Sequence, residues 1–173
     1  PGISKTQLKL HYQQEFLVYV RDFPVLLARV HGQNPPPDVR RMIAENIYEE
    51  DTGGLSFGRS HPELFNEMMR GLGFDGETFR RAKLLPASVR YRGWLEKVTA
   101  SRDWVVGAAA LAVFVEGSIK DRQEIQAPSK PKTEAEIEAY IDAHPLIRHH
   151  GIGRQHMDLI RAHQKVEAGH RQD

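Results

Sequence analysis

Two histidines and a glutamate near the end of the chain have the spacing of a metal site on one helix face. They are His163, Glu167 and His170. At about 100° per residue, their side chains project from the same side of an α-helix. Imidazole and carboxylate groups suit iron, manganese or zinc. The alternative is a solvated polar face, which the polar character of this segment permits. His156 lies on the same face, either as a supporting group behind the ligands or simply as an exposed residue.

Glu116 is a second candidate ligand, because it follows the uncharged run 104–115. A helix that is apolar on every side is expected to be buried. A carboxylate at the end of such a helix is costly to bury unless it is paired or bound to a metal. Glu116 therefore either binds a metal or reaches solvent just beyond the core.

Glu50 and His61 form a third candidate group, on the two sides of a glycine-rich loop. Glu50 lies on the inward face of a predicted helix, and His61 is in the first turn of the next one. Glu49 and Asp51 flank Glu50 and compete for its role. The alternative is an ordinary acidic helix end, although acidic residues favour helix N-termini rather than C-termini.

Glu15 is the fourth candidate and the only glutamate in the first predicted helix, where it shares a face with His11, Tyr12 and Tyr19. Its alternative is a surface glutamate on an amphipathic helix, which is the commoner case. Four separate segments thus each offer a carboxylate, and two of them add histidine. Helical bundles build di-iron sites from inward Glu and His residues of facing helices. Open positions on such iron bind and activate O2.

Capping boxes and helical spacing predict the elements that must position these residues. No segment shows the sustained alternation of a β-strand. The predicted helices span about 4–30 with a kink at Pro24, 38–51, 60–71, 76–82, 87–99, 104–117, 133–143 and 153–170. The pattern predicts one all-α domain over residues 1–173, an up-and-down bundle of six to eight helices, with residues 126–133 as a surface linker.

Composition excludes several classes of function. The 173 residues contain 24 Lys and Arg and 23 Asp and Glu, interleaved along the chain, so no charge favours nucleic acid or a membrane surface. The lack of cysteine excludes disulfides, thiolate metal sites, iron–sulfur clusters and a cysteine nucleophile. No signal peptide is visible, and the run 104–115 is shorter than the roughly 20 residues that span a membrane. We therefore expect a cytoplasmic protein without nucleic-acid or membrane partners.

Together, these motifs resemble the haem-oxygenase-like di-iron oxidases, a group of iron-containing redox enzymes related to the TenA and PqqC proteins. The resemblance covers essentially the whole chain, and the closing motif at 163–170 is its most specific part. It rests on the segments Val20-Arg-Asp-Phe-Pro24, Asn46-Ile-Tyr-Glu-Glu50, His61-Pro-Glu-Leu64, Phe114-Val-Glu-Gly-Ser118 and His163-x3-Glu167-x2-His170.

The resemblance implies a haem-oxygenase-like or TenA-like bundle that binds two iron ions, cycling between Fe2+ and Fe3+, with manganese or zinc as substitutes. The implied ligands are Glu15, Glu50, His61, Glu116, His163, Glu167 and His170. The chain departs from the family where Glu167 replaces the Asp of many members, and where the stretch from Glu116 to His163 is long. The resemblance also places the start of the chain at the family's second helix, so a partner chain in a homodimer is expected to fill the edge left by the first.

We therefore expect an O2-dependent oxidase or oxygenase that acts on a small organic substrate and draws electrons from an unidentified donor. Glu15, Glu50 and Glu116 are its expected catalytic carboxylates, with Tyr12 and Tyr19 near enough to be oxidised or to relay electrons. The expected pocket is lined by Phe16, Val20, Phe23, Leu111 and Phe114.

Two alternatives remain. One is a metal-free enzyme or ligand-binding protein of the PqqC or TenA kind, which would use its histidines as acid–base groups. Against it, TenA thiaminases depend on a cysteine nucleophile, which this chain lacks, and an enzyme like PqqC would not need the set His163, Glu167 and His170. The other is an interaction protein whose acidic and histidine residues all lie at the surface.

Overall fold

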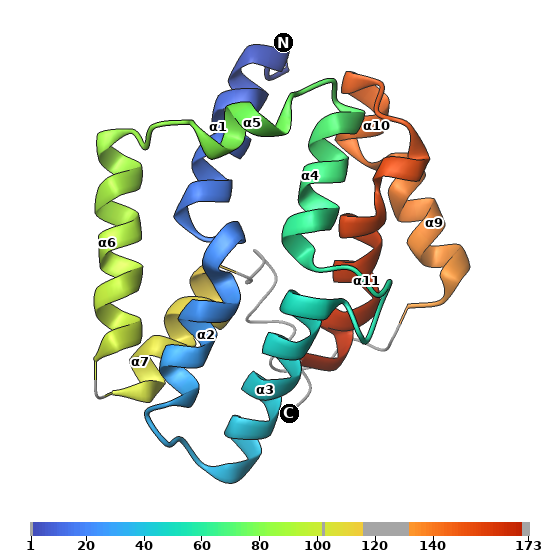
Figure 1. The fold of residues 1–173 in the computed structure, drawn as a ribbon. Coiled ribbons are helices and arrows are strands. Elements are labelled where there is room, and N and C mark those ends of the chain that lie inside the picture. Colours follow the sequence, from blue (N-terminus) through green and yellow to red (C-terminus); the bar gives the residue numbers. More distant parts are fainter. Residues whose placement is uncertain (1, 102, 116–131, 171–173) are drawn as a thin grey trace.

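Helices make up every regular element that the structure describes. The computed structural model describes residues 2–101, 103–115 and 132–170, and for 166–170 it gives only the course of the helix. Figure 1 shows these helices arranged side by side, and the all-α class predicted from the sequence is confirmed. No described helix is both long enough and apolar enough to cross a lipid bilayer.

The first predicted helix is divided. The predicted capping box starts α1, Lys5–Val18, and the chain then passes through a short 3-10 turn, η1 Val20–Asp22, into α2, Phe23–His31. The break lies at Tyr19 and in η1, one turn earlier than the kink expected at Pro24. A proline ring has no N–H to donate and collides with the carbonyl four residues before it, so it disrupts the turn that precedes it.

Helices α3, Pro37–Thr52, and α4, His61–Gly71, form a hairpin around the glycine-rich loop. Gly53 ends α3 with a φ of 62°, in the left-handed region that favours glycine. The predicted capping box is present at Ser60, and α4 begins at the next residue, His61. The last turn of α3 and the first turn of α4 are thereby brought together, as the sequence analysis expected.

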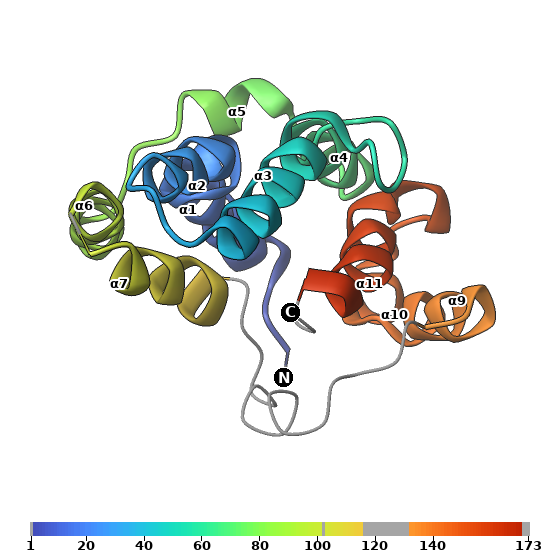
Figure 2. The ribbon, with the colours of Figure 1, turned by 90° about the horizontal axis from the view of Figure 1, so that it is seen from below.

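The middle of the chain forms one edge of the bundle. Helices α6 and α7 lie together beside α2, at the left of Figures 1 and 2. The α7 helix continues into a π-helical segment, η2, a winding that often occurs near functional sites. The bounds are α5 Gly76–Arg80, α6 Pro86–Ala100, α7 Trp104–Ala109 and η2 Ala110–Val115.

The expectation that the apolar run 104–115 is buried on every side is wrong. Val106 is 45% exposed and Phe114 is 70% exposed, whereas Gly107 and Leu111 are buried. Among the described elements, the segment packs mainly against α2 and α6, at the edge of the bundle. An apolar sequence can indicate a buried helix but does not supply the neighbours that would bury it.

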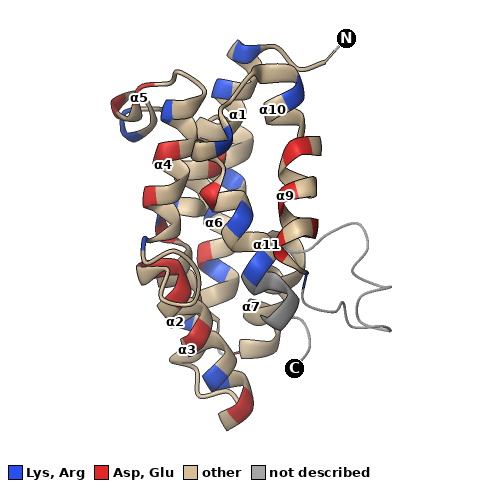
Figure 3. Cartoon of the chain, turned by 90° about the vertical axis from the view of Figure 1, so that its right-hand side faces the viewer, with Lys and Arg blue, Asp and Glu red and all other residues tan. Residues whose placement is uncertain are grey.

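The last part of the chain forms α9, Glu134–Ala143, α10, Pro145–His150, the 3-10 turn η3, Arg154–His156, and α11, Asp158–His170. The short α10 was not predicted, and α11 begins five residues later than expected. Arg154 and Arg161 both bind Glu138 of α9, which ties η3 and α11 to that helix. Figure 3 shows acidic residues along α9 and basic residues on the neighbouring α11.

Two clusters of buried apolar residues hold the helices together. One joins α1, α4, α9 and α11 and includes the fully buried Phe65 and Met69. The other joins α2, α3, α6 and η2 and includes the fully buried Leu26 and Val30. The candidate site lies where these two clusters meet.

Gly53 offers a test of how the loop between α3 and α4 is held. A Cβ atom at this position would lie 2.1 Å from the backbone oxygen of Arg59, in addition to the strain of a φ of 62°. Gly58 has a φ of 67° but open space around its Cβ position, so it is a matched control. We expect Gly58→Ala to cost about 1–2 kcal/mol of unfolding free energy, for the strain alone.

Gly53→Ala should cost at least about 1 kcal/mol more than Gly58→Ala, because the backbone of the loop must also shift. Urea denaturation of the two variants and the unsubstituted protein measures this difference. Equal losses would show that the loop can move without cost, and that it does not fix the approach of α3 to α4.

Candidate metal centre

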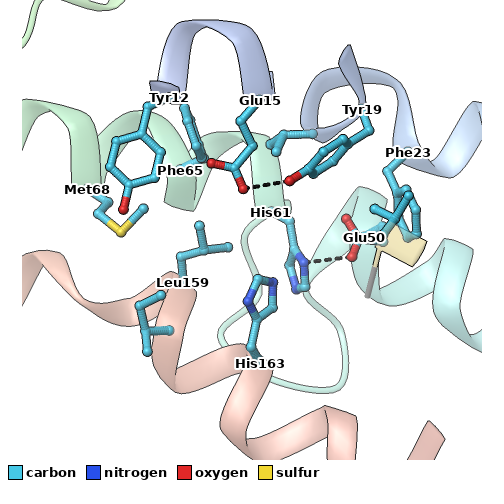
Figure 4. A pocket seen from close by; sticks show the side chains of 13 residues that line it. Tyr12, Glu15, Tyr19, Phe23, Glu50, His61, Phe65, Met68, Leu159 and His163 are labelled. Atoms are coloured by element: carbon cyan, nitrogen blue, oxygen red, sulfur yellow. Dashed lines mark hydrogen bonds and ion pairs between the residues drawn. The ribbon is translucent and has the colours of Figure 1, made fainter. Parts of the chain in front are cut away.

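A cavity of about 280 Å³ lies at the seam between the two clusters, with walls from α1, α2, α3, α4, η2 and α11. Figure 4 shows the side chains that point into it. Its polar residues are Tyr12, Glu15, Tyr19, Glu50, His61 and His163. Its apolar residues are Val20, Phe23, Phe65, Met68, Val115, Leu159 and Ile160. No Lys or Arg is among the described residues that line it.

Glu50 and His61 meet directly at one end of the cavity. The Nδ1 atom of His61 lies 2.8 Å from Oε1 of Glu50, and both side chains are less than a tenth exposed. The approach exists because the loop returns the chain from the last turn of α3 to the first residue of α4. Burial opposes a charge on the ring, but the contacts with Glu50 and Glu49 outweigh it and raise the pKa of His61.

Glu49 takes a different place from Glu50, although the two are adjacent in the sequence. Its carboxylate is 1% exposed and is not part of the cavity wall. It accepts hydrogen bonds from the backbone N–H of Leu55 at 2.7 Å and from the hydroxyl of Ser56. It also lies 3.3 Å from Nε2 of His61. Of the two competing glutamates, Glu50 therefore faces the cavity and Glu49 holds the loop.

His163 reaches the cavity from α11, in the other half of the chain. Its ring centroid lies 5.0 Å from that of His61, with the two rings tilted edge to face (Figure 4). Burial, and then the charge of His61, lower the pKa of His163 to about 3. The imidazole is therefore neutral near pH 7, which is the form that binds metals.

Glu15 and Tyr19 form a pair within the end of α1. The Tyr19 hydroxyl donates a hydrogen bond to Oε1 of Glu15 at 2.7 Å (Figure 4). The other oxygen, Oε2, is buried without a hydrogen-bond partner among the described residues, and its only ion-pair contact is His11 Nε2 at 3.5 Å. Burial, and then the charge of Glu15, raise the pKa of Tyr12 and of Tyr19. Both phenols therefore keep their protons across the physiological range.

The structure brings together most of the predicted site that it describes. The described candidates that share the cavity are Tyr12, Glu15, Tyr19, Glu50, His61 and His163. Glu116 lies outside the described residues. Glu167 and His170 belong to α11, the helix that carries His163, but their side chains lie outside the described part. Within the described side chains, no three His, Asp or Glu residues converge closely enough to hold a metal ion.

His156 does not line the cavity. Its side chain packs over Gly71, and its Nδ1 atom lies 3.9 Å from Glu67. The shared helical face predicted for His156 and His163 assumed one continuous helix. Because α11 begins only at Asp158, that periodicity does not extend back to residue 156.

The apolar wall differs in part from the expected one. Val20 and Phe23 line the cavity as expected. Phe16 and Leu111 are buried in the two clusters instead, and Phe114 points outward beside Trp94. Sequence reasoning missed the wall that α4 and α11 provide. Its signal was the apolar residues one or two turns away from the two histidines on the same helices: Phe65 and Met68 after His61, and Leu159 and Ile160 before His163.

Comparison with known proteins identifies the family. The profile of the family described as iron-containing redox enzyme matches residues 10–173. The chain belongs to this family. The haem-oxygenase-like helical fold expected from the sequence is thereby confirmed, and membership in an iron-containing redox enzyme family implies iron and redox chemistry. No curated protein and no solved structure matches the chain significantly.

The cavity residues fit iron in the chemistry of their donors. Two carboxylates and two imidazoles face one space, and these are ligand types that non-haem iron accepts. One carboxylate oxygen of Glu15 is buried without a hydrogen bond, which is costly unless a cation or donor is supplied. The close approach of His61 Nδ1 to a Glu50 oxygen likewise requires a proton or a cation between them.

The lowered pKa of His163 makes the metal-free protein sensitive to acid. In the unfolded chain the ring has a pKa near 6.5. Between about pH 6.5 and 3 the unfolded state therefore binds a proton that the folded state does not, so stability falls as the pH falls. The raised pKa of His61 changes the stability only above about pH 6.5, so it does not affect the stability between about pH 6.5 and 3.

We expect His163→Gln to reduce the loss of stability between about pH 6.5 and pH 5, because glutamine does not titrate. Urea unfolding of the metal-free proteins at several pH values measures the slope. The exposed His149 provides the control, and His149→Gln should keep the original slope. An unchanged slope in His163→Gln would mean that this ring is protonated in the folded state as readily as in the unfolded one.

Proposed function

We propose that this protein is a non-haem di-iron oxidase or oxygenase that uses O2 to oxidise a small organic substrate. The observation that carries the proposal is the cavity lined by Glu50, His61 and His163 inside a member of an iron-containing redox family. These residues come from α3, α4 and α11, so three helices must pack correctly before the donors face one another. A surface location, as in an interaction protein, does not fit the burial of Glu50 and His61.

In this proposal Glu50, His61 and His163 hold iron from one side. The resemblance adds Glu116, Glu167 and His170, and it also assigns Glu15 as a ligand. When bound, two iron ions would supply the electrons and the open coordination positions that O2 reduction requires. An external reductant would then return Fe3+ to Fe2+ after each turnover.

The cavity walls suggest what kind of substrate is admitted. Its volume of about 280 Å³ lies near the lower end of the range of roughly 300–1,000 Å³ for small-molecule sites. The side chains of Phe23, Phe65, Met68 and Leu159 give part of it an apolar wall. Because no Lys or Arg is among its described lining residues, the protein offers no fixed positive charge to an anionic substrate. A small, largely apolar molecule fits these walls best.

Tyr19 and Glu15 add a site that can hold or move a proton at the edge of this space. The phenolic proton already lies on a hydrogen bond to the Glu15 carboxylate, at 2.7 Å. The raised pKa of Tyr19 keeps that proton on the phenol until an oxidation removes an electron from the ring. The pair is thus suited to give up an electron and a proton together, with Glu15 as the acceptor of the proton.

Iron binding tests the proposal. Anaerobic metal-free protein is titrated with Fe(II), and the visible spectrum is recorded after exposure to O2. We expect about two iron ions per chain and a transient visible band. Loss of a residue that only hydrogen-bonds a metal ligand typically weakens metal binding by roughly 10–100-fold. We expect a larger loss of iron affinity in His61→Ala and in His163→Ala, because each variant removes a direct donor.

His149→Ala is the matched control, since His149 is exposed on α10, and it should bind iron like the unsubstituted protein. If the unsubstituted protein takes up less than about one iron per chain and gives no band, the oxidase proposal is wrong. A metal-free enzyme of the same fold, which uses His61 and His163 as acid–base groups, would then be the better interpretation.

A further inference from the structure

Glu49 makes more contacts than closing the loop requires. Both oxygens are used: Oε2 accepts from the N–H of Leu55, and Oε1 accepts from the hydroxyl of Ser56. Those two bonds are sufficient to close the loop over α3. The third contact, from Oε1 to Nε2 of His61, joins this buried carboxylate to a residue of the cavity wall.

The position of Glu49 also carries a cost that loop closure alone does not explain. It lies in the last turn of α3, where the helix dipole is unfavourable to a negative charge. It is also almost fully buried, at 1% exposed. A buried carboxylate needs several strong donors, and the His61 ring is one of the three donors around Glu49.

The hydrogen-bond inventory decides how the His61 ring is held. An ionised carboxylate has only acceptors to offer, so the nitrogen that faces Glu49 must carry a proton. That nitrogen is Nε2. When a cation binds, the other nitrogen, Nδ1, is then the one that can offer it a lone pair. Nδ1 is the atom that lies 2.8 Å from Glu50, the carboxylate that faces the cavity.

We propose that Glu49 is a positioning residue that holds the Nε2–H of His61 and turns its Nδ1 atom toward Glu50 and the cavity, so that His61 binds the metal through Nδ1. The metal-binding part rests on the proposed function. Histidine ligands commonly donate their second ring N–H to a carboxylate, which fixes the tautomer and the ring orientation. Glu49 and Glu50, adjacent in the sequence, thus divide two tasks around one ring.

Glu49→Gln tests this division of tasks with little change in shape. An amide has one acceptor oxygen and one NH2 donor. If the oxygen stays with the N–H of Leu55, the NH2 group faces His61, and Nε2 must then accept a hydrogen bond. The proton of the neutral ring therefore moves to Nδ1, where it competes with a metal. Glu45→Gln is the control, because Glu45 is an exposed glutamate of the same helix.

Nitrogen NMR of isotope-labelled histidine reads the two ring nitrogens of His61 separately. In the metal-free protein we expect Nε2 to carry a proton in the unsubstituted protein and in Glu45→Gln, whether or not Nδ1 also carries one toward Glu50. In Glu49→Gln we expect Nε2 to have no proton and Nδ1 to carry one. With Zn(II) as the probe, the resonance that changes on binding should be Nδ1. Zn(II) affinity should fall by roughly 10–100-fold in Glu49→Gln and stay unchanged in Glu45→Gln.

Ser56→Ala separates positioning from loop closure, since it removes one loop contact and leaves the Glu49–His61 contact in place. It should keep the proton of His61 on Nε2. The proposal is overturned if Zn(II) binds through Nε2, or if Nε2 still carries its proton in Glu49→Gln. If Glu49→Gln does not fold, the measurement on the unsubstituted protein decides alone.

The two proposals fail in different ways. A protein that binds neither iron nor zinc contradicts the proposed function and the metal-binding part of this inference. Whether Nε2 of the metal-free His61 ring carries a proton then still decides whether Glu49 positions it. Iron uptake together with an Nε2 that carries no proton in the unsubstituted, metal-free protein would support the oxidase and reject the role of Glu49.

Discussion

The site depends on one buried arrangement, an imidazole held between two carboxylates. His61 is nearly inaccessible to solvent and contacts Glu49 through one ring nitrogen and Glu50 through the other. Each of these groups would be costly to bury alone, and each lowers the cost of the others. The left-handed turn at Gly53, the hydrogen bonds to Leu55 and Ser56, and the capped start of α4 all serve to keep the three together.

The rest of the fold completes this arrangement from a distance. One apolar cluster carries His61 and His163, and the other supports the wall formed by Phe23 and Val115. The cavity lies at the seam between the clusters rather than inside either one. Polar groups can therefore gather at the seam without interrupting the packing that stabilises each cluster. Small shifts of one cluster against the other would change the distances between donors while leaving both cores intact.

Much of this could be predicted from the sequence, where the signal was local. Capping boxes gave the starts of α1, α4 and α9, and the pairing of Glu50 with His61 followed from the short glycine-rich loop. The role of Glu49 could not be predicted, because neighbouring residues at a helix end both reach the same region. The path of the loop backbone decides between them, and that path depends on which N–H groups need an acceptor.

Other expectations failed where they relied on periodicity or polarity without knowledge of neighbours. His156 was placed beside His163 by counting turns, but the helix does not reach it. Phe114 was expected to line the pocket, but its side chain is largely exposed at the edge of the bundle. The cavity walls from α4 and α11 were missed because the sequence pattern of their apolar residues is the same for a cavity wall and for a closely packed core.

The two histidines of the cavity differ in how late in folding they can meet their partners. His61 and Glu50 are joined by a short loop, so their contact needs little chain entropy and can form as soon as the α3–α4 hairpin forms. His163 comes from the far end of the chain and reaches them only after α11 has docked. A cation shared by both histidines would bind the finished fold more tightly than any partly folded state. Occupancy of the centre would then report that the whole chain has folded.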